Sequence, residues 1–475
     1  MRTRKAYKII ITGIFLFMFA GILPAAENDK TADTPDMSRT LGIEEFVKLA
    51  AQNDTKFEEI LIDELALQYR KDLNLPARDL ILSVKAQYDF FLSQDREEPE
   101  STVSLEKLFP YFGTSFSASY KSTPSFSSQV NSSEFTFSIS QPIAKNAFGS
   151  ATRLQDKIIG LEMDVARHQI IEAYEDYFAA VINIYYDWYE AYENLKIGES
   201  SYAENLKLLE NIRQRSISKI ALPIDVHKID IQVLAKKEKL VNLMEEYGRA
   251  LNMVKKAIRY KGVETLMPKE PALYKWEGID FERDYQAFKV NSRTHQILRL
   301  LENKSLLEVD KNANDLLPSI NLIFGYEVNG DDFEIENEDN KIIAGVSMQL
   351  PLFEQVQNAE HKVSKITLDK TRLSAQSIDA QLYFDLKNLY RQIERERELI
   401  AISNKKIQLA QDVVVDETEN YSFGKITLND FIQAVNVLDD NRFSNITHST
   451  RLRQLIAEWL RLTDVLVNAS VLKKY

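Results

Sequence analysis

The sequence predicts a mixed α and β protein that is mostly helical and is built from two versions of one pattern. Three observations predict this fold class. Two stretches of about 65 residues, at about 151–215 and 356–420, contain no proline and are expected to be single long helices. Shorter segments alternate apolar and polar residues with a period of two, as β-strands do. Each half of the 475-residue chain runs in the same order of helix, strands, very long helix, turn and return helix.

The first version of the pattern is expected at about 40–260 and the second at about 278–470, with a linker at 261–277 between them. The opening helix of each version should end at a proline, because the residue before proline is biased away from helical backbone angles. These positions are Leu75-Pro76 and Leu317-Pro318.

The expected helix lengths fit a tube of constant length. At 1.5 Å per residue, a helix of about 65 residues is about 98 Å long, whereas helices of globular domains average about three turns. The return helices, at about 225–260 and 430–467, and the opening helices together nearly equal one long helix. Two short helices stacked end to end could therefore lie beside one long helix. Asn53 and Asn291 take matching places inside the two opening helices.

The first residues are predicted to be a secretory signal peptide, at 1–26, and are set aside. The start is basic, residues 9–23 are apolar, and small residues follow at Ala25 and Ala26. The apolar stretch is shorter than the roughly 20 residues of a membrane-spanning helix. We therefore expect export with cleavage near Ala25 or Ala26, and no later segment is apolar enough to predict a transmembrane helix.

Composition narrows the function classes. The formal net charge is −12, and removing the four cations of the signal, Arg2, Arg4, Lys5 and Lys8, makes it −16. Such a surface repels phosphate backbones, which argues against nucleic-acid binding. The chain has no cysteine, so an exported protein of this kind must be held together by packing or assembly, and a lipid-modified N-terminal cysteine is excluded.

The alternating segments, at about 78–145 and 318–352, have one apolar and one polar face. Phe135, Phe137 and Ile139, for example, alternate with hydroxyl side chains. A soluble antiparallel sheet with one face on a core would show the same pattern. Strand lengths of about nine to twelve residues, polar faces rich in Ser, Thr and Gln, and polar loops favour a transmembrane β-barrel instead.

A β-barrel in lipid must close, because unpaired backbone groups at an open edge cost several kcal/mol each. Four strands from one chain are too few, since about eight make the smallest filled barrel. Copies must therefore be pooled around a cyclic axis, and three copies of four strands would give twelve. Each half must contribute an even number of strands. The second half has two, and the first has two or four, depending on whether 102–108 pairs with 114–121; two continuous crossings with irregular extensions are favoured.

The order and doubling of these signals resembles the TolC family of outer-membrane efflux proteins over about residues 40–470. The two Leu-Pro pairs precede the strands, and Gln141-Pro142-Ile143 and Leu350-Pro351-Leu352-Phe353 follow them. The most specific motif is the turn Gly424-Lys-Ile-Thr-Leu-Asn-Asp430. Its counterpart in the first half is Lys219-Ile-Ala-Leu-Pro-Ile-Asp225, with lysine in place of the usual glycine.

The resemblance implies a homotrimer in which a pooled transmembrane β-barrel continues into a long periplasmic α-helical barrel. It implies an outer-membrane channel of a Gram-negative-type envelope that extends into the periplasm. Such a channel is the passive exit duct of a tripartite efflux or type I secretion system. The implied partners are a periplasmic adaptor, or membrane fusion protein, and an inner-membrane pump or ABC transporter, which together open the periplasmic tip. The transported substrate is not predicted.

By the same resemblance, the two turns form the periplasmic tip and dock the adaptor. The residues concerned are Lys219, Ile220, Asp225, Gly424, Lys425, Ile426 and Asp430. Asp225 and Asp430 open their helices, where a carboxylate interacts favourably with the helix dipole. Well-known members carry a second acid three residues later that helps form an acidic ring at the aperture. Lys228 and Gln433 take those places here and are candidate aperture residues. The sequence therefore does not decide whether the aperture carries an acidic ring.

Motifs for catalysis or cofactor binding are not found. Gly424-Lys425 with Thr427 lacks the leading glycine of a phosphate loop, and no Gly-x-Ser-x-Gly elbow occurs. The five histidines are too far apart for a helical metal pair. Aromatic pairs such as Tyr185-Tyr186 and Trp188-Tyr189 are interpreted as packing between helices. The sequence therefore predicts no enzyme, cofactor or metal site. The alternative from another class is a periplasmic coiled-coil scaffold or adhesin without a pore.

Overall fold

The computed structural model describes residues 38–91, 96–123, 132–219, 221–262, 265–272, 276, 280–331, 339–350, 352 and 355–467. The chain divides into two units. The first consists of residues 1–39 with 263–265, and the second of residues 40–262 with 266–475. The predicted signal peptide, at 1–26, lies outside the described residues and stays a prediction. The long helices and the large sheet all belong to the second unit.

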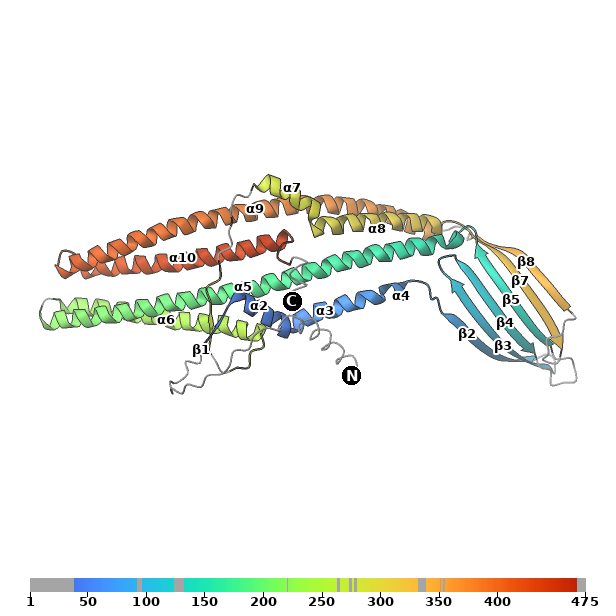
Figure 1. Ribbon diagram of the computed structural model, residues 1–475, viewed down its shortest axis with the longest axis horizontal. Helices are drawn as coiled ribbons and strands as arrows, with labels where there is room; N and C mark the ends of the chain where they lie inside the picture. The colour runs from blue at the N-terminus through green and yellow to red at the C-terminus, as the bar shows by residue number, and fades with distance from the viewer. Residues whose placement is uncertain are drawn as a thin grey trace, which may run out of the picture. The chain divides into compact units, whose positions relative to one another are not determined.

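Two antiparallel helical hairpins dominate the second unit (Figure 1). Helix α5 (Ser150–Ile217) returns as α6 (Pro223–Ala257), and α9 (Gln355–Ser422) returns as α10 (Leu428–Leu462). The two long helices have 68 residues each and the two returns have 35 each. At 1.5 Å per residue a long helix extends for about 100 Å. The predicted long helices and returns are therefore confirmed to within a few residues.

The opening helix of each half is broken where the sequence predicted it to be continuous. The first half has α2 (Ile43–Asn53), α3 (Thr55–Ala66), the 3-10 turn η1 (Leu67–Tyr69) and α4 (Arg70–Asn74). The second half has α7 (Phe281–Asn291) and α8 (Arg293–Asp315). Asn53 and Asn291 therefore end short helices, and the expectation that they lie inside a helix was wrong. The next residues, Asp54 and Ser292, have extended ψ angles of 130° and 131° that stop the helical ladder.

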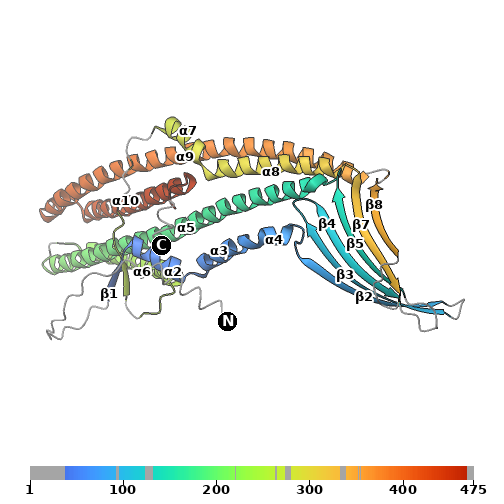
Figure 2. The same ribbon diagram turned by 45° about the vertical axis from the view of Figure 1, so that its right-hand side comes forward.

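Short helices lie end to end beside each long helix, as predicted (Figures 1 and 2). Helix α5 packs against α6 over one part of its length and against α2, α3 and α4 over another. Helix α9 packs in the same way against α10 and α8. The two hairpins meet because α5 also packs against α10 and α8. One side of this layer is formed by α6 and α2–α4, and the opposite side by α9.

A six-stranded antiparallel sheet follows the helices at one end of the unit (Figure 1). Its strands are β2 (Leu80–Phe91), β3 (Arg96–Phe109), β4 (Thr114–Thr123), β5 (Ser132–Pro142), β7 (Ser319–Asp331) and β8 (Asp339–Gln349). They lie in the order β2-β3-β4-β5-β7-β8. A small second sheet pairs β1 (Ser38–Leu41) with β6 (Thr265–Pro268), so a strand begins within the segment expected to be a linker.

The first half contributes four described strands, so the preference for two continuous strands with irregular extensions was wrong. Residues of β3 pair with β2 on one side and with β4 on the other. The alternation of β3 is interrupted because Pro99, Ser101 and Lys107 take places on its apolar face. These interruptions hid a strand that is continuous in the backbone.

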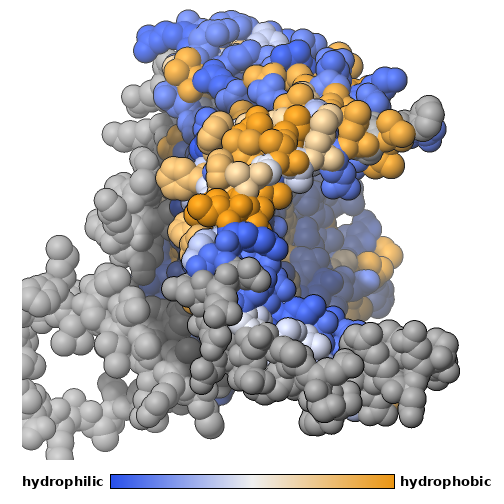
Figure 3. Space-filling view, turned by 90° about the vertical axis from the view of Figure 1, so that its right-hand side faces the viewer, coloured by the Kyte–Doolittle hydropathy of each residue, from blue (hydrophilic) through white to orange (hydrophobic). Residues whose placement is uncertain are grey.

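The predicted faces of the strands are confirmed by the register. Phe116, Ala118 and Tyr120 on β4 lie opposite Ile139, Phe137 and Phe135 on β5. The same face continues onto β7 and β8, where Phe324 is 55% exposed and Ile342 is 83% exposed. Figure 3 looks at the sheet end of the molecule, where apolar surface forms a continuous area bordered by polar surface. One face of the sheet is thus apolar and unusually exposed.

The best-packed core lies where α2, α5 and α6 meet. Tyr185 and Trp188 on α5 are both fully buried, with ring centroids 5.7 Å apart. The hydroxyl of Tyr185 donates to the carbonyl of Leu41 at 2.9 Å. The prediction that these aromatic residues pack between helices is therefore confirmed. Within the described residues, no helix is both long enough and apolar enough to cross a membrane.

Candidate functional site

The first of the two predicted tip turns joins α5 to α6. Lys219 adopts a left-handed backbone conformation, with φ at 52°, where the family pattern has glycine. Its N–H donates to the carbonyl of Ser216 at 3.0 Å, and the N–H of Ala221 donates to the carbonyl of Arg215 at 3.2 Å. These bonds cap the end of α5. Ile220 lies outside the described residues.

The second turn joins α9 to α10 and also contains a residue in the left-handed conformation. Gly424 has φ at 69°, and its N–H donates to the carbonyl of Tyr421 at 3.0 Å. The N–H of Lys425 donates to the carbonyl of Asn420 at 3.0 Å. This pair of bonds is a Schellman motif, which ends a helix at a left-handed residue. The loop therefore reverses the chain with the last carbonyls of α9 hydrogen-bonded.

The two tip aspartates have different local roles. Asp430 closes a capping box: its N–H donates to Thr427 Oγ1 at 3.3 Å, and its carboxylate accepts from the N–H of Thr427 at 3.1 Å. The hydroxyl and N–H of Thr427 lower the pKa of Asp430. Asp225 lies in the first turn of α6 without a side-chain cap, and its carboxylate lies 3.7 Å from the ammonium of Lys228. Both carboxylates are placed favourably for the helix dipole, but only Asp430 is held by a cap.

The structure brings the two turns together through an apolar cluster. Leu428, at the start of α10, is buried with Leu209 and Ile212 of α5 and with Ile229 and Val233 of α6. The α5–α6 and α9–α10 hairpins thus end in one shared packing unit. This unit is called the tip cluster below.

Aromatic contacts add to the tip cluster. The guanidinium of Arg215 lies 5.0 Å from the centre of the Tyr421 ring, and that ring stacks on Phe431 with centroids 5.7 Å apart. Burial raises the pKa of Tyr421; the Arg215 guanidinium opposes this shift, and the charge of Asp225 adds to it. The end of α5, the end of α9 and the start of α10 are therefore in direct contact.

Most of the predicted tip residues point away from this cluster. Lys219, Lys228, Gly424, Lys425, Asp430 and Gln433 are exposed, and Asp225 and Ile426 are half-buried. Asp430 and Gln433 also line a shallow groove between α9 and α10. Leu409, Val413 and Val437 give this groove an apolar floor and are 47–55% exposed. The tip therefore exposes charged side chains and an apolar groove.

A buried polar layer next to the tip cluster was not predicted. Asp439 of α10 is 1% exposed, and its carboxylate lies 2.7 Å from the ammonium of Lys236 on α6. The hydroxyl of Ser201 on α5 donates to the same carboxylate. A neighbouring amide pair, Gln232 Nε2 to Asn436 Oδ1 at 2.7 Å, also joins α6 to α10. Three helices are thus joined by polar contacts in a place where coiled helices usually pack with apolar side chains.

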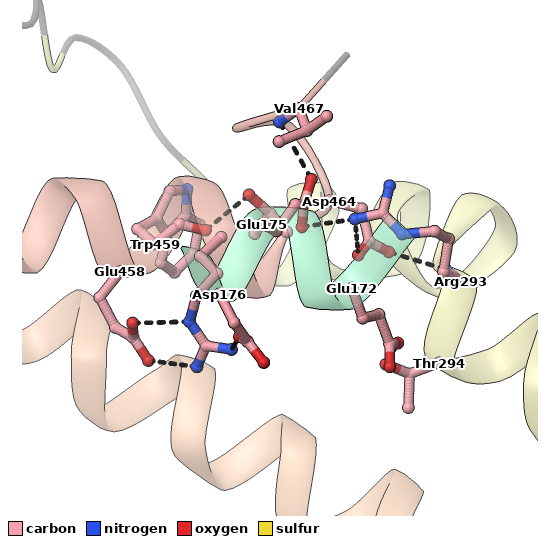
Figure 4. A network of polar contacts seen from close by, with 11 residues as sticks. Glu172, Glu175, Asp176, Arg293, Thr294, Glu458, Trp459, Asp464 and Val467 are labelled. Atoms are coloured by element: carbon pink, nitrogen blue, oxygen red, sulfur yellow. Dashed lines mark hydrogen bonds and ion pairs between the residues drawn. The ribbon is translucent and has the colours of Figure 1, made fainter. Parts of the chain in front are cut away.

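A second polar network lies midway along the helices, where α5, α8 and the end of α10 meet (Figure 4). The guanidinium of Arg293 forms ion pairs with Glu175 and, at 2.8 Å, with Asp464. The N–H of Val467 donates to Glu175 at 3.1 Å, which fixes the chain after α10. Arg461 pairs with Asp176 at 2.6 Å in the same region.

The acids of this central network carry pKa shifts that follow from their burial. Glu175 is 2% exposed, and burial raises its pKa although Arg293 and the N–H of Val467 oppose the shift. Burial and the nearby Asp464 carboxylate raise the pKa of Glu172, against the effects of Arg293 and of the Thr294 hydroxyl. Three carboxylates therefore share the cation of Arg293 in a partly dry site.

Two histidines of the described part of the chain, His295 and His448, contact carboxylates. His295 is 7% exposed, and its Nε2 lies 2.8 Å from Asp379. The ammonium of Lys289 lies 2.6 Å from the same carboxylate, and both partners lower the pKa of Asp379. Among the described residues, no group of three or more His, Cys, Asp or Glu side chains is arranged to hold a metal ion.

Paired helical hairpins of about 100 Å that end in a common tip, with an antiparallel sheet at the far end, define a class of protein: this chain has the fold of outer-membrane channels. The channel VceC of Vibrio cholerae superposes with a TM-score of 0.69 at 12% identity, covering 89% of this chain and 95% of that chain. CusC gives 0.69 at 9% identity, covering 89% and 91%, and CmeC of Campylobacter jejuni gives 0.68 at 12% identity, covering 90% and 86%.

The likeness is one of structure. No family model matches the sequence, and no curated protein matches it either. At 9–12% identity, equivalent side chains are almost all different, so the shared property is the fold. The TolC-like fold predicted from the order of helices, prolines and strands is thereby confirmed.

Proposed function

We propose that this protein is a subunit of an outer-membrane channel that extends into the periplasm and serves as the exit duct of a tripartite efflux or type I secretion system. The proposal rests on one observation: the fold combines two different parts. One part is a sheet with an exposed apolar face and a polar face, and the other is a layer of helices about 100 Å long. The first part suits a bilayer, and the second suits the width of a periplasm.

The helical layer supports assembly into a closed ring of copies. Its α6 side exposes Ile231, Leu234 and Val241, which are 58–68% accessible. Its α9 side exposes Ile366, Leu373 and Phe384, which are 61–66% accessible. Apolar rows on opposite sides of one subunit can bury each other when copies are arranged head to tail around an axis. We assign three copies to this ring, in line with the TolC resemblance of the sequence.

The sheet supports the same arrangement. Among the described residues, no strand pairs with the outer side of β2 or of β8, which are the edge strands of the sheet in a single copy. In lipid such edges must be paired, so neighbouring copies would join their sheets into one barrel. The apolar face would then contact lipid and the polar face would line a wet lumen.

The tip supports a regulated periplasmic end. Lys219 and Lys425 of the two turns are exposed outside the tip cluster, and so is the groove between α9 and α10. We propose that an adaptor of the membrane fusion type docks here and that an inner-membrane pump supplies the energy. The chain contributes a passive conduit, and Lys228 and Gln433 are the proposed aperture residues.

The proposal is tested with the purified full-length protein. Extraction should require detergent, and the purified oligomer should be a trimer that conducts ions in planar bilayers. A matched control is the Phe137→Arg variant, which carries a cation on the proposed lipid face and should give no channels. A protein that stays soluble and monomeric in plain buffer and does not conduct would support a scaffold without a pore.

A further inference from the structure

The described part of this chain contributes six strands to its sheet, and this number has a consequence for the barrel. The strands are all antiparallel to their neighbours, from β2 at one edge to β8 at the other. Because the number is even, the two edge strands run in opposite directions. The β8 edge of one copy can therefore pair with the β2 edge of the next in the same antiparallel way as every pair within the sheet.

The first two strands belong to the same surface as the other four. One row of directly paired residues crosses all six strands and is apolar throughout. Its members are Leu82, Leu105, Ala118, Phe137, Tyr326 and Ile342. The neighbouring row is polar throughout. Its members are Ser83, Ser104, Ser119, Thr136, Glu327 and Lys341. Strands β2 and β3 thus continue both faces of the sheet in register.

The exposure of apolar side chains is similar at the two edges. Leu82 and Val84 on β2 are 65% and 72% exposed, and Ile342 and Val346 on β8 are 83% and 66% exposed. Strand β2 has 12 residues and β8 has 11, so the two edges also match in length. An edge strand of this length and apolarity is stable in a bilayer only if its backbone is paired.

We propose that β2 of one copy pairs with β8 of the next, so that each copy contributes six strands and a ring of three copies closes as an eighteen-strand barrel. This inference rests on the proposed function, because it assumes three copies in a membrane. It goes beyond that function because it assigns β2 and β3 to the barrel wall. In a copy that contributed four strands, β4 would be the edge strand instead.

The polar face describes the lumen of such a barrel. Barrels of 16 to 18 strands enclose a water-filled channel rather than a core of side chains. The polar rows carry small hydroxyl groups, such as Ser117 and Ser138 with oxygens 2.8 Å apart, and ion pairs such as Lys121 with Glu100 at 3.1 Å. These side chains suit a wall that faces water.

Cysteine cross-linking can test which strand meets β8, because the natural chain has no cysteine. Val84→Cys on β2 is combined in turn with Ile342→Cys, Ala344→Cys and Val346→Cys on β8, and membranes are oxidised with copper phenanthroline. All four positions lie on the apolar face, and directly paired Cβ atoms lie about 4.5–5.5 Å apart. The matched series replaces Val84→Cys by Ala118→Cys on β4, which lies on the same face.

We expect cross-linked dimers and trimers on non-reducing gels for at least one β2–β8 pair and none for the β4 series or for single cysteines. Cross-links in the β4 series without any in the β2 series would overturn the six-strand copy and leave the trimeric duct intact. Cross-links in neither series, from a protein that reaches the membrane, would overturn both the inference and the pooled barrel on which it rests.

Discussion

The ammonium of Lys236 on α6 lies 2.7 Å from the carboxylate of Asp439 on α10, and both side chains are almost completely removed from solvent. This pair joins the hairpin of the first half to the hairpin of the second half. It lies next to the tip cluster, so movement of one hairpin relative to the other requires these charges to separate. The proposed gate is therefore tied to a specific polar contact.

Removing Lys236 should loosen the two hairpins. Lys236→Met removes the nearer cation of the buried Asp439 carboxylate and leaves Arg442 at 3.9 Å, so the cost should be at most roughly 3–5 kcal/mol, the range for breaking a buried pair. We expect a lower Tm and a larger resting conductance in planar bilayers. The matched control is Lys239→Met, because Lys239 lies 3.8 Å from the exposed carboxylate of Asp440 and such pairs contribute about 0–1 kcal/mol.

A double variant separates the charge from the packing. Lys236→Met with Asp439→Leu removes both charges and keeps apolar volume, so it should recover most of the lost stability. If resting conductance stays high while Tm recovers, the polar contact itself restrains the gate. Equal Tm values for the natural protein and Lys236→Met would show that the pair does not hold the hairpins together.

Glu172 should make the central network less stable as pH rises. Its pKa is raised above its ordinary value of 4.5, first by burial and then by Asp464. The folded protein therefore binds this proton more tightly than the unfolded chain, and the associated stability is lost as pH rises through the folded pKa. Glu172→Gln should flatten this part of the pH dependence and raise Tm at pH 7 on the order of 1 °C.

Melting curves between pH 4.5 and pH 7.5 check the prediction for Glu172. Glu199→Gln is the control, since Glu199 lies on the same helix and is exposed. If Tm depends on pH in the same way in the natural protein and in Glu172→Gln, Glu172 does not contribute to the pH dependence of stability. A slope that increases in Glu172→Gln would contradict the sign of its shift.

The two faces of β5 should respond in opposite ways to a cation. Phe137 packs edge-on against Phe116, with centroids 4.5 Å apart, on the apolar face. Phe137→Arg places a charge in lipid, which costs about 2–4 kcal/mol at mid-bilayer, and should prevent assembly. Ser138→Arg lies on the polar face and should be tolerated. Trimer formation in outer-membrane fractions measures both, and equal assembly of the two variants would contradict the orientation of the sheet.

The tip carboxylates should influence the closed state. Reversing both charges, Asp225→Lys with Asp430→Lys, is expected to change resting conductance and antibiotic leakage at least twofold, because both lie where the hairpins end. Asp430 also caps α10, so Asp430→Asn is needed as a control that keeps an oxygen for the cap. Unchanged conductance in the double reversal would remove these residues from the gate.

Much of the fold could be predicted from local signals in the sequence. Prolines after Leu75 and Leu317 mark helix ends through backbone sterics alone, and the long proline-free stretches favour uninterrupted helices. The breaks at Asp54 and Ser292 could not be predicted, because neither residue forbids helix. Strand β3 was underestimated because Pro99 and Lys107 interrupt its alternation, while its pairing partners decide its conformation.

The candidate site was predictable only in part. The sequence predicted a chain reversal at Lys219 and another at Gly424. Both residues adopt left-handed conformations, and the α5–α6 and α9–α10 turns lie at the same end of the helices. The buried contact of Lys236 with Asp439 could not be read from the sequence, because charged residues on helices are normally solvated. One signal was present: Asp439 follows Leu428 and Phe431 at spacings of 11 and 8 residues, which places it on their buried stripe.

The two turns allow an exchange experiment on the cost of a left-handed residue. Lys219 has φ at 52° and Gly424 has φ at 69°, and open space surrounds the position of a Cβ on Gly424. A side chain at Gly424 is therefore opposed by the backbone conformation alone, at about 1–2 kcal/mol. Gly424→Lys should destabilise its turn by this amount, whereas Lys219→Gly should be neutral or stabilise the other turn by up to about 1 kcal/mol.

Hydrogen exchange of the amides at Ala221 and Lys425, which bond across the turns, measures each loop separately. Faster exchange at Lys425 in Gly424→Lys with no loss of protection at Ala221 in Lys219→Gly is the expected pattern. Loss of protection at Ala221 in Lys219→Gly would mean that the lysine side chain, and not the turn geometry, holds the first tip.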